Sequence, residues 1–230
     1  THECVRLIGY GAGDGPLWER FVYAFSRKGV LHLLAPFVPT ESPRLPQSVY
    51  DLILEDFLVS HPLQFATLVE KWAPCASENQ QEALFDVDVL LERLLNYRST
   101  SPWHHMAHAH LYRYRRDWTK SLTYYLDSTN VGTRVGDEAS SAQLKAYDFS
   151  TVLSMIATHD LFATIHDRVW QLTRLDATRA CEFLVKYREQ VPIPAVVQQV
   201  RRDRSFLHLY LHQLFVSAQD SYNVQEYAEY

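Results

Sequence analysis

Glycine and proline are scarce in this chain, which holds 7 glycines and 10 prolines among 230 residues. Small β-sandwiches and barrels need many tight turns, and glycine and proline are the residues that form most of them. The low counts therefore argue against a loop-rich β architecture. They favour helices joined by a limited number of turns.

Cysteine is rarer still, and long apolar runs are missing. Cys4, Cys75 and Cys181 lie far apart and are odd in number, so they form neither a disulfide framework nor a Cys-x-x-Cys metal pair. Such cysteine usage is typical of a reducing, cytosolic setting. No apolar run approaches the roughly 20 residues that a membrane-spanning helix requires.

No excess of positive charge is present either. The 22 basic and 27 acidic residues give a formal net charge of −5, which offers no electrostatic case for binding nucleic acid. Two short basic runs, 113–116 and 201–204, have acidic residues nearby. We expect them to be solvated faces or charges that offset a helix dipole. The alternative is a weak contact with anionic lipid headgroups or with an acidic partner.

The dominant positive signal is helical periodicity in a chain that is 47% hydrophobic. A short apolar piece at 30–37 is expected to fold back on the first helix, and Ser77 to Gln80 have the spacing of a capping box. The pattern predicts helices over residues 16–29, 48–60, 63–72, 77–95, 102–116, 118–127, 162–174, 176–190 and 194–218.

These helices, with short turns between them, predict an all-α fold, an array of antiparallel helical hairpins. We expect a single segment over residues 1–230. Because the chain opens with Thr-His-Glu-Cys, without Met or a signal-like stretch, we expect it to be a fragment of a longer protein. Residues 128–144 are polar, small and aperiodic, and we predict a flexible loop inserted between two helices.

A glycine-rich stretch, Gly9 to Gly15, is the strongest hint of an enzyme. A strand, a glycine turn and a helix from Pro16 would place backbone N–H groups against a pyrophosphate, as in a dinucleotide-binding fold. Three observations oppose this alternative. Asp14 stands where the pattern needs its third glycine, Pro16 interrupts the junction, and no strand–helix alternation follows.

Four histidines, His104, His105, His108 and His110, fall within seven residues. His104 and His108 could share one helix face and one metal ion, as could the pair formed by His208 and His212. No third ligand is apparent, and the glutamate of a zincin motif is absent because His105 occupies its place. We therefore expect surface and groove histidines. The sequence predicts no catalytic, cofactor-binding or metal-ligating residue.

Several segments taken together resemble one family, in order and spacing along nearly the whole chain. The sequence is similar to the helical region of the vacuolar protein sorting-associated protein 41 family, subunits of the HOPS tethering complex. The segments that carry the resemblance are 17–19, 22–25, 34–39, 49–58, 65–72, 159–162, 210–215 and 227–230.

The resemblance implies an α-solenoid of the clathrin-heavy-chain-repeat type. In the family it lies between an N-terminal β-propeller and a C-terminal zinc-binding domain of RING type. It further implies a non-catalytic tethering scaffold without a cofactor, acting when late endosomes and vesicles fuse with the vacuole or lysosome, including the AP-3 route. The implied partners are the other HOPS subunits and, through the full-length protein, a Rab7-type GTPase and the AP-3 adaptor. The implied location is cytoplasmic and peripheral on those membranes. The alternative is a helical-repeat scaffold of another coat or tether complex.

Overall fold

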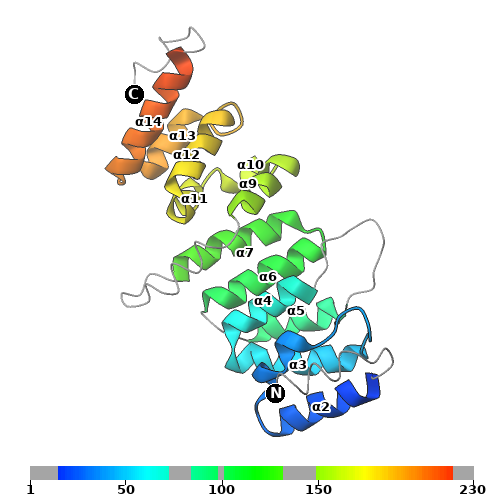
Figure 1. The fold of residues 1–230 in the computed structure, drawn as a ribbon. Helices are drawn as coiled ribbons and strands as arrows, with labels where there is room; N and C mark the ends of the chain where they lie inside the picture. The colour runs from blue at the N-terminus through cyan, green and yellow to red at the C-terminus, as the bar shows by residue number, and fades with distance from the viewer. Residues whose placement is uncertain (1–14, 73–83, 98–100, 132–148, 220–230) are drawn as a thin grey trace. The chain divides into compact units, whose positions relative to one another are not determined.

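A computed structural model describes residues 15–72, 84–97, 101–131 and 149–219 of the chain (Figure 1). Every regular element within these ranges is an α-helix or a 3₁₀-helix, and none is a strand. The predicted all-α helical-repeat fold is confirmed. The chain forms two compact units, Thr1–Asp117 and Trp118–Tyr230. That residues 1–230 make one continuous solenoid segment stays a prediction.

The first unit is built from antiparallel helices, with α4 packed between α3 and α6. His61 alone separates α3 from α4, and α4 packs along both α3 and α6. The described elements are α2 (Gly15–Arg27), η1 (Leu31–Leu33), η2 (Ala35–Phe37), α3 (Gln47–Ser60), α4 (Pro62–Trp72), α5 (Val87–Asn96) and α6 (Pro102–Tyr114). The expected fold-back at 30–37 is made by the two 3₁₀ turns.

Aromatic side chains fill the seams of this unit. Tyr50 and Trp72, both fully buried, meet edge to face with ring centroids 5.3 Å apart. The Tyr50 hydroxyl donates to the Pro39 carbonyl at 2.8 Å and accepts the Leu45 N–H at 3.2 Å. One side chain of α3 thus holds both ends of the 39–45 loop. Arg93 of α5 also pairs with Glu55 of α3.

The second unit continues the same construction. Its described elements are α7 (Trp118–Val131), α9 (Phe149–Thr158), α10 (Phe162–Ile165), α11 (Val169–Leu175), α12 (Ala177–Lys186), α13 (Ile193–Val200) and α14 (Arg204–Gln219). α12 packs against α11 and α14, and α11 also contacts α7 and α13. Phe183 and Tyr187 have ring centroids 4.7 Å apart, and Phe162 lies 5.1 Å from Tyr187, which makes an aromatic seam between α10 and α12.

Two of the predicted C-terminal helices, 162–174 and 194–218, are each broken in two. The helix expected at 162–174 stops at Ile165 and restarts at Val169. The helix expected at 194–218 is interrupted at 201–203, where the Asp203 carboxylate accepts the Phe206 N–H at 3.0 Å and begins α14. Periodicity did not reveal these breaks, because both halves bury apolar residues at helical spacing.

Two further boundaries differ from the prediction. The helix expected to run through Leu84 begins at Val87, because the Asp86 carboxylate accepts the N–H groups of Asp88 and Val89. The predicted capping box at 77–80 lies outside the described residues. In the second unit α7 extends to Val131, so residues 128–131 of the predicted loop are helical. Residues 132–144 of that loop are outside the described ranges.

Candidate functional site

The histidine-rich helix α6 is the densest group of titratable side chains among the described residues. His104, His108 and His110 are buried, with 4%, 7% and 5% of their surface exposed, so of the expected surface and groove histidines these three lie in the grooves between helices. The cause is the position of α6, which packs against α4 and α5 and leaves little of its circumference to water. His105 is half-buried.

Backbone carbonyls fix the orientation of two of these rings. His104 donates its Nε2–H to the carbonyl of Leu58, 2.9 Å away on α3, and His108 donates its Nδ1–H to the His104 carbonyl at 2.9 Å. A carbonyl can only accept, so each ring must carry its proton on the named nitrogen. His104 therefore ties α6 to α3, and its ring also lies 5.1 Å from that of Tyr97.

Burial keeps these histidines neutral at physiological pH. Loss of hydration lowers the pKa of His108 to about 4, outweighing the hydrogen bond to His104, which raises it. Burial likewise lowers the pKa of His110 to about 4 against the opposing charge of Glu70. The pKa of His104 is lowered for the same reason. Neutral, carbonyl-bonded rings are typical of a structural role.

No group of three or more His, Cys, Asp or Glu side chains within the described ranges is placed to hold a metal ion. His208 and His212 lie on one face of α14 as the spacing predicts, with stacked rings whose centroids are 6.3 Å apart. Both are exposed. The glycine-rich stretch lies outside the described residues except for Gly15, which begins α2. The described part of the chain contains no strand to build a dinucleotide-binding sheet.

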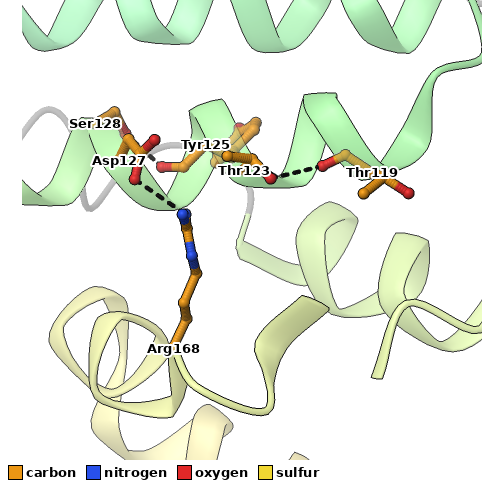
Figure 2. Close-up of polar contacts among 6 residues, drawn as sticks. All are labelled: Thr119, Thr123, Tyr125, Asp127, Ser128 and Arg168. Atoms are coloured by element: carbon orange, nitrogen blue, oxygen red, sulfur yellow. Dashed lines mark hydrogen bonds and ion pairs between the residues drawn. The ribbon is translucent and has the colours of Figure 1, made fainter. Parts of the chain in front are cut away.

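The second candidate site is the Asp127–Arg168 ion pair, which joins helices distant in the sequence. In the second unit Arg168, which precedes α11, reaches the carboxylate of Asp127 on α7 with 3.0 Å between Nη1 and Oδ1 (Figure 2). Both side chains are about two-thirds shielded from solvent. Figure 2 also shows Ser128 and Thr123 donating to carbonyls within α7, of Tyr125 and Thr119. The ion pair spans 41 positions, and no sequence signal pointed to it.

The break between α10 and α11 is held by one amide side chain from α13. The Val169 N–H donates to Oε1 of Gln199 at 2.9 Å, and Nε2 of Gln199 donates to the His166 carbonyl. A helix that breaks leaves backbone groups without helical partners, and burial of such groups is costly. Gln199 satisfies one on each side of the break, which lowers the cost of interrupting the helix there.

The two basic runs lie at helix ends, as expected. Arg115 pairs with Asp88 of α5 at 3.1 Å, beside the end of α6. Arg201 and Arg202 form the turn between α13 and α14 and are exposed. No described helix is long and apolar enough to cross a bilayer.

The chain is similar to proteins of one family along most of its length. The sequence model of the family described as "Vps41 TPR-like region" matches residues 4–230. The chain belongs to the Vps41 family. The resemblance inferred from the sequence is therefore confirmed, and the match extends across both units.

The curated relatives of the Vps41 family come from animals and plants. The chain is 26% identical to the vacuolar protein sorting-associated protein 41 homolog of Homo sapiens over 232 residues, which cover 100% of this chain and 23% of the relative. The homolog of Solanum lycopersicum is 29% identical over 92% of this chain and 20% of its own length. The chain thus spans 20–23% of the length of these relatives. No solved structure matches it.

Proposed function

We propose that this chain is a non-catalytic scaffold segment of a HOPS-type membrane-tethering subunit. It acts when vesicles and late endosomes fuse with the vacuole or lysosome, including along the AP-3 route. The helices hold the parts of the full-length protein that flank them, so that partners bound to those parts are presented together. The segment itself carries out no chemical step.

The observation that carries this proposal is the family match over residues 4–230. The matched relatives are named for vacuolar protein sorting. The packing is in keeping with a scaffold, because the described helices bury aromatic and aliphatic faces against one another in both units. Two of the buried histidines, His104 and His108, are bonded to backbone carbonyls, which suits support of the fold more than proton transfer.

The partners follow from the same proposal. They are the other HOPS subunits, with a Rab7-type GTPase and the AP-3 adaptor bound through the full-length protein. The protein would be cytoplasmic and peripheral on vacuolar, lysosomal and late-endosomal membranes. The competing proposal is a scaffold of another coat or tether complex, and the proteins that co-purify with the full-length protein distinguish the two.

Affinity purification of the tagged full-length protein from cells that lack the untagged copy tests the proposal. The other HOPS subunits should co-purify with the parent protein and be lost from Phe57→Asp, whose side chain is 1% exposed. Val59→Asp, two residues along α3 and 64% exposed, should retain them.

Two results would contradict the proposal. A stable parent protein that captures subunits of a different coat, and none of HOPS, supports the competing scaffold. If Phe57→Asp retains every HOPS subunit, this segment is dispensable for assembly.

A further inference from the structure

A solvent-open hollow of ≈ 530 Å³ lies in the second unit, beside α11 and the turn between α13 and α14. Its lining combines an aromatic face, Trp170, with three arginines, Arg174, Arg201 and Arg202. Ligand pockets in proteins commonly enclose about 300–1,000 Å³ and combine apolar surface with a few polar groups. The hollow has the size of a binding site, and its lining is mostly polar and charged.

The lining of the hollow is positively charged, whereas the whole chain is negatively charged. The protein carries a formal net charge of −5, yet three arginines face one aspartate here. Arg201 and Arg202 make no ion pair with any carboxylate of the described residues. The one acid, Asp203, already accepts the Phe206 N–H at the start of α14. The guanidinium groups are therefore available to an anionic ligand.

Two features hold the hollow in shape before a ligand arrives. The Arg174 guanidinium carbon lies 5.5 Å from the centroid of the Trp170 ring, a cation–π contact that limits the freedom of both side chains. Gln199, which also lines the hollow, bonds the backbone at Val169 and His166 and so fixes α11 against α13. A preorganised site loses less conformational entropy on binding.

The geometry points to an acidic peptide segment of a partner protein as the occupant: we propose that its carboxylates bind Arg201 and Arg202 and that an apolar side chain packs on Trp170. Guanidinium groups bind carboxylates in bidentate pairs. Trp170, 37% exposed, offers an apolar face, and the exposed amide of Gln198 can bond a peptide backbone. A membrane surface fits less well, since with Arg204 the hollow and its edge hold four arginines, the lower end of the about 4–8 basic residues common in clusters that bind anionic lipid.

This inference goes beyond the proposed function, because it does not depend on which complex contains the protein. Fluorescence anisotropy of the 230-residue chain with a labelled peptide, Glu-Asp-Glu-Phe-Glu-Asp-Glu, tests it. The peptide should bind at low salt, and its amide analogue, Gln-Asn-Gln-Phe-Gln-Asn-Gln, should bind at least tenfold more weakly. The double variant Arg201→Glu/Arg202→Glu should weaken binding at least tenfold, and Trp170→Ala should weaken it severalfold.

The matched control is Arg20→Glu/Arg27→Glu, which makes the same change of net charge at exposed positions of α2. It should bind the acidic peptide as the parent chain does. Equal loss in both double variants would show non-specific attraction and overturn the proposal, as would the absence of peptide binding by the parent. If phosphatidylserine vesicles bind the parent and the peptide does not, the hollow belongs to a lipid-binding surface instead. A Trp170→Ala chain that binds as tightly as the parent contradicts the role given to the indole.

Discussion

At the scale of single residues, the histidines of α6 show how position in the fold decides the chemistry of a side chain. His104 and His108 have the spacing of a metal-binding pair, yet both rings donate a hydrogen bond to a carbonyl and both are buried. His208 and His212 repeat that spacing on an exposed face. The sequence could predict which histidines share a face. It could not predict which face is covered, because coverage depends on helices distant in the chain.

The buried histidines make the first unit sensitive to acid. In the folded state the pKa values of His108 and His110 are about 4, while in the unfolded chain they return to about 6.5. Between pH 4 and pH 6.5 the unfolded chain therefore binds more protons than the folded one. Stability is therefore complete above pH 6.5 and is lost as the pH falls toward 4, by roughly 3 kcal/mol for His108 alone.

Urea unfolding of the 230-residue chain at a series of pH values measures this loss. His108→Gln removes one titrating group and should flatten the fall in unfolding free energy between pH 6.5 and 4. His212→Gln, at an exposed position of α14, is the matched control and should leave the profile as it is. A parent chain equally stable at pH 7 and pH 4.5 would contradict the buried, neutral histidines.

At the scale of elements, helix ends explain most differences between prediction and structure. Gly29, at φ 65°, ends α2 with the Val30 N–H bonded to the Phe25 carbonyl, and a glycine at that position is a recognisable stop signal. α6 and α9 end in the same way, but with Arg116 at φ 61° and Asp160 at φ 51°. Residues other than glycine rarely adopt a positive φ. The ends of α6 and α9 therefore carry no comparable sequence signal.

The interrupted helix at 162–175 gives a prediction for Gln199. Gln199→Leu would leave the Val169 N–H and the His166 carbonyl without their partner, at a cost of about 2 kcal/mol in unfolding free energy. Gln199→Glu keeps the acceptor for Val169 but loses the donor for His166, so its cost should be intermediate. Chemical denaturation of each variant measures the effect.

Gln198, the neighbour of Gln199 in the chain, provides the control. Gln198 is exposed, and Gln198→Leu should change the unfolding free energy by no more than about 0.5 kcal/mol. If Gln199→Leu is as stable as Gln198→Leu, the amide does not hold the break between α10 and α11.

The aromatic seams give the strongest prediction for the helices themselves. Phe57 on α3 and Phe183 on α12 are 1% and 7% exposed. Replacing either with Asp removes a buried ring and places an unpaired charge in a seam, which should cost more than about 4 kcal/mol and unfold the helices around it. Circular dichroism melting curves measure this. Val59→Asp should melt as the parent does, and parent-like melting of both buried variants would contradict the assigned seams.

At the scale of the whole molecule, fold class and family could be predicted from the sequence, while the contacts that give the chain specific surfaces could not. Periodicity and scarce glycine were enough for the all-α fold, since every turn of an amphipathic helix repeats the signal. The Asp127–Arg168 ion pair joins residues 41 positions apart, and the arginine-lined hollow combines side chains of α11 with the α13–α14 turn. Such juxtapositions have no local pattern.

The measurement that tests the central claim most directly is fusion of late endosomes with the vacuole or lysosome, followed by content mixing. Cells lacking the protein should fuse poorly, and the full-length protein should restore fusion. The same protein without residues 4–230, the range of the family match, should fail to restore it. Full restoration by that deletion protein, expressed at the level of the parent, would contradict a scaffold role for this chain.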